Sequence, residues 1–451
     1  MQLLRFSVAN HRSISDEVTL DLAPRLGNRT APKGSDSWDD VISPAVAILG
    51  ANASGKSNLL DALVYALEAV RSSATTWLAY QRIPRTPHRG FTRGDSEPTE
   101  VTLDFLLEEI RYSYFFSLDD HRVIEETLHW VPSQRWSQCF RRVTEESGDV
   151  RIDWNTSFLK AAEHKRLGSL NPRELVLSAG VRAREPRLAE LVRELTSAVG
   201  FTRHSELVQR AGVDRLIDSI RQDRFSLDQA TQLVQAADVG ITRVTLEEER
   251  IPQEVLQKIQ KLRSVFDEDD DKESPGGPED LTDEDLEDVA YNLRFSHQGA
   301  DGEFILRLAD ESEGTISWLA TAPMALGVLR EGGVLIADEI DASMHVALFE
   351  AVLSAFADPE INRRGAQLIF TTHNTNLLEH LQELEFAPEQ IWFAEKDSKG
   401  GSIFYPLSDF STPKDANFER RYLAGRYGAL PRPNLSVVRR LVAEGITEEE
   451  S

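Results

Sequence analysis

The chain has 451 residues and a formal net charge of −25, with 41% hydrophobic and 28% charged residues. This length allows two or three domains with a sizeable core, and the composition is that of a soluble globular protein. No apolar run approaches the ~18 residues of a membrane span, and the first residues lack the pattern of a signal peptide. The single cysteine, Cys139, excludes an intrachain disulfide and a cysteine metal cluster. We therefore expect a cytoplasmic protein without a membrane partner.

The negative charge is concentrated in residues 267–288, which hold thirteen acidic residues and one basic residue, Lys272. The favoured interpretation is a solvated loop, and the alternative is an acidic binding segment. The rest of the chain is still acidic, which argues against broad non-specific coating of DNA. A local basic groove stays open as an alternative.

The N-terminal third is predicted to be mainly strands. Residues 1–25 alternate apolar and polar side chains, which indicates two strands that meet near residues 10–13. After a polar connection, residues 46–49 form an apolar run, and a glycine-bounded loop and a helix to about Ala74 follow. Residues 78–99, rich in proline and basic side chains, predict a loop. Alternation with period two up to about Val143 then predicts an antiparallel meander.

The glycine-bounded loop reads Gly-Ala-Asn-Ala-Ser-Gly-Lys-Ser and lies between a predicted strand and helix, which is the context of a phosphate-binding P-loop. Its glycines let successive N–H groups point inward, and the new helix N-terminus adds to this anion nest. Lys56 is expected to reach the β- and γ-phosphates, and Ser57 to take one Mg²⁺ position. The residues expected to bind the nucleotide here are Gly50, Ala51, Asn52, Ala53, Ser54, Gly55, Lys56, Ser57 and Asn58.

From about Phe158 to Leu262 the apolar period changes to 3.6, which predicts helices. We attribute their apolar stripes to core or helix-pair packing. Strands are predicted again at residues 291–295 and 304–308.

A second strand ends in carboxylates. Four apolar residues, 334–337, precede Asp338 and Glu339, which predicts a buried parallel strand that presents both acids at its C-terminal end. Asp338 is expected to bind Mg²⁺ directly or through water, and Glu339 to polarise the attacking water as general base. The pattern alone is weak, and it gains meaning because it lies downstream of a P-loop.

Two further groups of polar residues suit the same site. The apolar strand from Gln367 ends at His373, which would hydrogen-bond the γ-phosphate or the water, unless it is structural. Ser312, Gly314 and Thr315 precede a predicted helix and form either a simple N-cap or another anion nest. Because Lys56 and Asp338 are 282 positions apart, whole segments must be inserted between the two halves of the site.

The order of these motifs resembles the SMC-like, ABC-type ATPases. The chain is most similar to the AAA-type ATPase family that includes OLD-related proteins and the RloA and PARIS-type ATPases of bacterial defence operons. The tail from Arg421 to Pro431 resembles the same branch. The resemblance implies an α/β fold: a P-loop ABC/SMC-like ATPase head with an antiparallel β subdomain and an inserted helical domain. The expected domains are an N-terminal ATPase lobe (1–155), a helical insertion (156–288), a C-terminal ATPase lobe (289–432) and a tail (433–451).

The resemblance also implies roles for individual residues. Residues 50–57 correspond to Walker A, Asp338 and Glu339 to Walker B, and His373 to the switch histidine. Asp341 opens the D-loop, and Arg12 touches the nucleotide. Ser312, Gly314 and Thr315 stand at the signature motif, which in this family contacts the γ-phosphate bound to a second subunit. ATP and Mg²⁺ are thus the expected cofactors, in a homodimer or higher oligomer. No glutamine stands clearly in a Q-loop position, for which residues 87–91 are the candidate region.

The resemblance bears on function as well. Only 78 residues follow His373, which is too short for the nuclease domain of OLD proteins. We therefore expect an ATPase that senses or regulates a separately encoded effector, a nuclease or toxin, in antiphage defence. The alternative is a RecF-type ATPase that clamps DNA in repair, with nucleic acid as partner, although the acidic balance counts against it. A non-hydrolysing scaffold would require a degraded site, and Lys56, Ser57, Asp338 and Glu339 are all intact.

Overall fold

The computed structural model describes the whole chain except residues 35, 91–95, 198, 238–239, 251–288, 382–383, 385, 412–415, 431–434, 438 and 442–451. The acidic segment 267–288 and Phe91 of the candidate Q-loop region therefore lie outside the described residues. The described residues form two compact units. The first unit comprises Met1–His204, Met324–Ala342 and Phe349–Ser451, and the second comprises Ser205–Pro323 and Ser343–Leu348.

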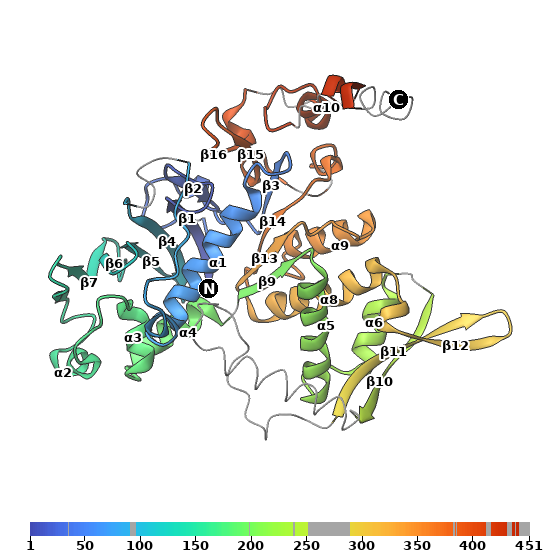
Figure 1. The fold of residues 1–451 in the computed structure, drawn as a ribbon, viewed down its shortest axis with the longest axis horizontal. Coiled ribbons are helices and arrows are strands. Elements are labelled where there is room, and N and C mark those ends of the chain that lie inside the picture. The colour runs from blue at the N-terminus through green and yellow to red at the C-terminus, as the bar shows by residue number, and fades with distance from the viewer. Residues whose placement is uncertain are drawn as a thin grey trace, which may run out of the picture. The chain divides into compact units, whose positions relative to one another are not determined.

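An antiparallel sheet of seven strands occupies the N-terminal part of the first unit (Figure 1), in the order β2-β1-β4-β5-β6-β7-β8. This confirms the predicted N-terminal strand pair and the meander. Phe6 of β1 pairs with Leu103 of β4, so the N-terminal pair belongs to the same sheet as the meander. The strands are β1 (Gln2–Ala9), β2 (Val18–Asp21), β4 (Thr99–Leu107), β5 (Ile110–Leu118), β6 (Val123–Trp130), β7 (Ser137–Thr144) and β8 (Val150–Trp154).

A second sheet of the first unit has six strands in the order β16-β15-β3-β14-β13-β9. All neighbours pair in parallel except β15 and β16. Every residue of β3, β13 and β14 is buried, as expected for parallel strands with apolar central residues. The strands are β3 (Ala45–Gly50), β9 (Val199–Arg203), β13 (Val334–Asp338), β14 (Gln367–Thr371), β15 (Ile391–Lys396) and β16 (Ser402–Pro406).

Helix α1 (Lys56–Ser72) joins the two sheets into one core. Its buried side chains, among them Leu59 and Leu63, belong to one apolar cluster with Phe6 of β1 and Ile336 of β13. Helices α3 (Val176–Arg182) and α4 (Pro186–Thr196) pack against α1. The P-loop helix is thus held on both sides by apolar contacts, which fixes its first turn relative to the sheet.

The second unit combines helices with a three-stranded antiparallel sheet, β10-β11-β12. Trp318 Nε1 donates a hydrogen bond to the carbonyl of Leu233 at 2.8 Å, which ties α8 to the end of α6. The division between the units falls at Pro323 inside α8. The elements of the second unit are α5 (Glu206–Arg221), α6 (Leu227–Gln235), β10 (Ile241–Arg250), β11 (Val289–Gly299), β12 (Gly302–Arg307) and the first part of α8 (Glu313–Glu331).

The remaining described helices have at most twelve residues. None of the helices in the described parts of the chain is long and apolar enough to cross a membrane. These remaining helices are α2 (Ala161–His164), α9 (Val346–Ala357), α10 (Phe418–Leu423), η1 (Pro24–Leu26), η2 (Thr76–Ala79), η3 (Lys165–Leu167), η4 (Leu308–Asp310), η5 (Thr375–Leu378), η6 (Pro388–Gln390) and η7 (Leu407–Asp409).

The structure departs from the sequence prediction within residues 158–262, which are not wholly helical. Strand β9 lies in this segment and extends the six-stranded sheet, with Val199 opposite Val334 and Arg203 opposite Asp338. Strand β10 also falls in it. A five-residue strand between two helices is too short to show its own period, so long-range pairing rather than local pattern decides its structure.

Candidate functional site

The ends of four parallel strands meet at one edge of the six-stranded sheet, where ligands bind in open α/β folds. The P-loop follows β3, Glu339 follows β13, His373 lies just beyond β14, and Arg203 ends β9. A cleft of about 590 Å³ opens there. It is lined by Asn52, Ala53, Ser54, Gly55, Lys56, Ser57, Asn58, Glu339 and His373. Residues predicted from three separate motifs thus line one cleft.

The two P-loop glycines lie where a side chain would not fit. A Cβ atom on Gly50 would overlap the carbonyl oxygen of Ala394 on β15. Gly55 has a φ of 106°, and its Cβ atom would overlap the Ser402 hydroxyl and lie 2.8 Å from Ser13 Oγ. Both positions therefore require glycine, one for close approach to a neighbouring strand and one for its backbone conformation as well.

Lys56 lines the cleft, and its side chain is largely buried. Its Nζ atom is 2.9 Å from the carbonyl oxygen of Gly50 and 3.3 Å from that of Ala51. His373 Nε2 lies 3.3 Å from the same ammonium. Burial lowers the pKa of Lys56, and the negative charges of Glu339, Asp338 and Asp341 oppose this shift. A partly desolvated cation of this kind attracts a phosphate strongly.

Asp338 is a buried carboxylate with three partners. Its Oδ1 accepts hydrogen bonds from Ser57 Oγ at 2.9 Å and from Thr371 Oγ1 at 2.7 Å. Its Oδ2 lies 3.0 Å from Nε of Arg203. The Ser57 hydroxyl and the Asp338 carboxylate are oxygen ligands in contact with each other beside the P-loop, which is the donor set that Mg²⁺ prefers. These two residues therefore fit a Mg²⁺ site.

Glu339 has a left-handed backbone, with a φ of 56°. For a residue with a Cβ atom this conformation costs roughly 1–2 kcal/mol, and it recurs at functional sites. The hydroxyl of Thr371 accepts the Glu339 N–H at 2.7 Å and so holds the turn. Glu339 Oε1 lies 3.6 Å from His373 Nε2, and both side chains are about 40% exposed. The carboxylate and the imidazole thus stand together at the open side of the cleft.

Arg12 does not line the cleft. Its Nε atom lies 2.6 Å from Asp61 of α1, and His11 Nε2 lies 2.8 Å from the same carboxylate oxygen. Burial raises the pKa of Asp61, but the hydrogen bond from His11 and the charge of Arg12 outweigh it and leave the pKa below its ordinary value. A nucleotide contact by Arg12 stays a prediction.

The loop at residues 10–13 supports the P-loop from behind. Ser13 Oγ accepts a hydrogen bond from Asn58 Nδ2 at 2.6 Å and lies 2.7 Å from Ser402 Oγ. Ser402 in turn donates to the carbonyl of Ser54 at 2.6 Å. Hydroxyls from two distant parts of the chain therefore fix the P-loop backbone.

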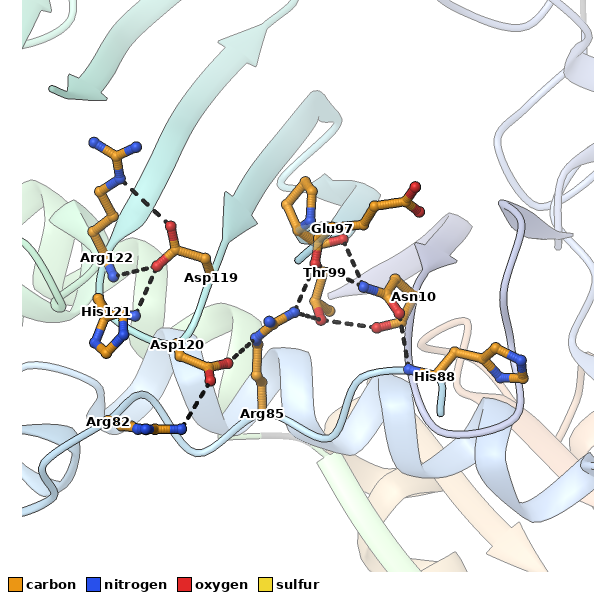
Figure 2. Close-up of polar contacts among 11 residues, drawn as sticks. Asn10, Arg82, Arg85, His88, Glu97, Thr99, Asp119, Asp120, His121 and Arg122 are labelled. Carbon is orange, nitrogen blue, oxygen red and sulfur yellow. Dashed lines mark hydrogen bonds and ion pairs between the residues drawn. The ribbon is translucent and has the colours of Figure 1, made fainter. Parts of the chain in front are cut away.

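Figure 2 shows how the candidate Q-loop region is fastened to this loop. Asn10 Oδ1 accepts the N–H of His88 at 2.8 Å, and Asn10 Nδ2 donates to the carbonyl of Glu97 at 2.8 Å. Arg85 reaches the β5–β6 turn, with Nε 2.6 Å from Asp120 Oδ1. Residues 85–88 thus link the back of the nucleotide site to the antiparallel sheet.

The predicted signature residues belong to the second unit and are described within it. Ser312 Oγ accepts the N–H of Thr315 at 3.1 Å, so it caps the start of α8. A Cβ on Gly314 would lie 2.9 Å from the carbonyl of Ser343, and Ser343 Oγ donates to Glu313 Oε2 at 3.2 Å. The start of α8 and the residues after the predicted D-loop therefore contact each other.

Asp341, the predicted start of the D-loop, lies in the first unit. Its Oδ1 is buried and accepts no hydrogen bond from any residue that the structure describes. An orphaned acceptor of this kind is costly unless a ligand or partner satisfies it.

The sequence does not predict that Arg203, Thr371 and Ser402 belong to the site. Arg203 gave no signal because β9 was not predicted. Thr371 lies two residues before the predicted site residue His373, but its contact with Asp338 depends on the parallel pairing of β13 and β14. Ser402 lies 348 positions from Ser54, and no local pattern links the two.

The fold and the cleft define the class of protein: an α/β protein with a P-loop at the carboxyl edge of a parallel sheet. The family model described as "AAA domain, putative AbiEii toxin, Type IV TA system" matches residues 45–180 and 181–379. The chain therefore belongs to this AAA domain family, an ATPase family. None of the curated proteins compared with the sequence matches it.

The solved structures that are similar to this chain include three SMC head domains, all distant in sequence. The SMC head domain from Thermotoga maritima is 11% identical and has a TM-score of 0.39, over 90% of this chain and 99% of that one. An Smc head bound to the C-terminal winged-helix domain of ScpA is 13% identical, with a TM-score of 0.34, over 90% and 97% of the two chains. An Smc head with an extended coiled coil, bound to the C-terminal domain of ScpA derived from Pyrococcus furiosus, gives the same values. These likenesses are too distant to assign a function.

Proposed function

We propose that this chain binds ATP with Mg²⁺ and hydrolyses it to ADP and phosphate. The observation that carries the proposal is the meeting of Lys56, the Ser57–Asp338 pair and the Glu339–His373 pair at one cleft. Membership of an AAA domain family supports it. Few other reactions need a P-loop lysine, a metal-binding serine and a general base at the ends of adjacent strands.

Each group has a proposed part in the reaction. The P-loop N–H groups and Lys56 hold the phosphates, and Lys56 exchanges the carbonyl of Gly50 for a phosphate oxygen. Ser57 and Asp338 hold Mg²⁺, which neutralises charge on the phosphates when bound. Glu339 takes the proton of the attacking water, and His373 holds the water or the γ-phosphate in place.

We further propose that two copies enclose the nucleotide. In this arrangement Ser312, Gly314 and Thr315 of one copy contact the ATP held by the other, and Asp341 finds its missing donor at the shared interface. The capped start of α8 supports this role, since a helix N-terminus favours an anion. ATP then closes the dimer and hydrolysis opens it.

The cycle is proposed to control a separately encoded effector, a nuclease or toxin, in antiphage defence. The family description, which refers to a toxin of a toxin–antitoxin system, supports a link to a toxic activity. The large negative charge favours a protein partner over DNA.

A pull-down from the native host tests the partner. Tagged Glu339→Gln protein is captured with ATP, and both proteins and nucleic acids are identified. We expect one protein at a stoichiometric ratio, which is absent when Lys56→Ala is used as bait. Duplex DNA without a protein partner would instead identify a DNA-clamping repair ATPase.

A further inference from the structure

The C-terminal segment around α10 (Figure 1, red) contacts strand β15 of the six-stranded sheet through stacked aromatic rings. The ring of Phe393 on β15 lies 5.3 Å from that of Tyr422 and 5.6 Å from that of Tyr427, both nearly parallel to it. The N–H of Ala429 donates to Glu395 Oε2 at 2.9 Å. Stacked rings and a charge-assisted hydrogen bond make this segment a rigid platform.

The platform is connected to the nucleotide cleft at two points. Strand β15 pairs in parallel with β3, so that Ala394 lies opposite Gly50 at the start of the P-loop. On the other side, Thr375 Oγ1 donates a hydrogen bond to Glu419 Oε1 of α10 at 2.6 Å. Thr375 follows His373 by two residues. One hydrogen bond therefore joins the segment that follows His373 to α10.

The platform exposes two basic side chains that flank an apolar side chain in the sequence. Arg420 and Arg426 are exposed, and Leu423 between them is 57% exposed. No carboxylate in the described parts of the chain forms an ion pair with Arg420 or Arg426. Leu435, Val437 and Leu441 are also exposed, so large apolar side chains gather in this part of the sequence. Clustered exposed apolar groups mark interaction surfaces.

We propose that Arg420, Leu423 and Arg426 form a docking surface for an acidic segment of a partner protein, and that the Thr375–Glu419 hydrogen bond couples its occupancy to the nucleotide site. The inference rests on the proposed function, which supplies the separate partner. Two guanidinium groups without a counter-ion among the described residues, on a chain of net charge −25, favour a carboxylate-rich ligand. Leu423, which lies between the two arginines in the sequence, favours a ligand that also carries apolar side chains. This requirement favours a peptide over DNA.

Binding is tested with a fluorescein-labelled peptide of four Glu-Glu-Leu repeats and full-length protein, followed by fluorescence anisotropy. We expect the double charge reversal Arg420→Glu with Arg426→Glu to weaken peptide binding at least tenfold. Lys33→Glu with Arg135→Glu, an equal charge change at exposed positions elsewhere, should alter the dissociation constant less than twofold. A Glu-Glu-Ser peptide should bind more weakly than the leucine peptide. Absence of peptide binding, or an equal loss with both double variants, overturns the docking surface.

The coupling is tested by measuring the peptide's dissociation constant with and without ATP in the Glu339→Gln background. We expect ATP to change this constant at least threefold, and Thr375→Val to reduce that ratio to about one while binding without ATP stays within twofold. An unchanged ratio in Thr375→Val overturns the coupling. ATP turnover by the wild-type protein is recorded in parallel. Turnover without peptide binding overturns the docking surface alone, whereas absence of turnover overturns the proposed ATPase.

A duplex oligonucleotide serves as the competing ligand in the same assay. If the duplex binds more tightly than the leucine peptide and the Arg420 and Arg426 reversals abolish it, the surface belongs to nucleic acid and the protein docking site is wrong.

Discussion

The guanidinium of Arg203 forms an ion pair with Asp338, with 3.0 Å between Nε and Oδ2. The pair follows from the sheet, because Arg203 ends β9 directly opposite Asp338 at the end of β13. Asp338 is buried, and a buried carboxylate is stable only when paired and hydrogen-bonded. Arg203 therefore holds one oxygen of Asp338, which leaves the other oxygen turned toward Ser57.

Replacement of Arg203 should impair turnover more than nucleotide binding. In Arg203→Gln the carboxylate of Asp338 loses its charged partner and its fixed orientation, so we expect kcat to fall about tenfold, or about 1.4 kcal/mol of barrier. ATP affinity should change less than threefold, because the P-loop contacts remain. Arg203→Lys keeps the charge and should recover part of the loss. Steady-state ATPase assays and titrations with a fluorescent ATP analogue measure both, and kcat within twofold of wild type would contradict this role.

Gly55 should not tolerate alanine. Its backbone is left-handed, and a Cβ atom would overlap the hydroxyl of Ser402, so Gly55→Ala should displace the P-loop and weaken ATP binding at least tenfold. Adding Ser402→Ala removes one clashing atom and should restore part of the affinity. Gly168→Ala is the matched control, because Gly168 is also left-handed but has no atom within 4 Å of the added carbon. Equal effects of the two alanine variants on thermal stability and ATP binding would refute the steric explanation.

Asp61 should stabilise the folded state in a pH-dependent way. Its folded pKa is depressed, so its contribution is present above the unfolded pKa of about 4 and is lost as the pH falls toward the folded value. Asp61→Asn should therefore destabilise the protein at pH 7, by about 1–3 kcal/mol for a charged hydrogen bond, and less at pH 3.5. Urea unfolding at the two pH values measures the difference. If the gap between wild type and Asp61→Asn stays constant with pH, the ionic account of His11, Arg12 and Asp61 fails.

The sequence predicts those parts of the site that local sequence patterns identify. A glycine-bounded loop before a helix and apolar runs that end in polar residues identify the ends of β3, β13 and β14 without any knowledge of pairing. The antiparallel meander was equally visible, because half-buried strands alternate with period two.

The rest depends on contacts between distant segments. Arg203 reaches Asp338 only because β9 adds to the far side of β13, and strand order is not written in any single window of sequence. The left-handed backbone of Glu339 likewise appears only once Thr371 of the neighbouring strand accepts its N–H. The ion pair between Arg12 and Asp61 is another contact that the sequence does not predict, and the predicted nucleotide contact of Arg12 stays a prediction.

Glu339 is proposed to act as the general base of an ATPase in which Lys56 holds the nucleotide. The most direct test measures ATP binding and ATP turnover by wild type, Glu339→Gln and Lys56→Ala under identical conditions. We predict that Glu339→Gln binds ATP at least as well as wild type but turns over about a hundredfold more slowly, and that Lys56→Ala does not bind ATP. Equal hydrolysis by wild type and Glu339→Gln would contradict the assignment.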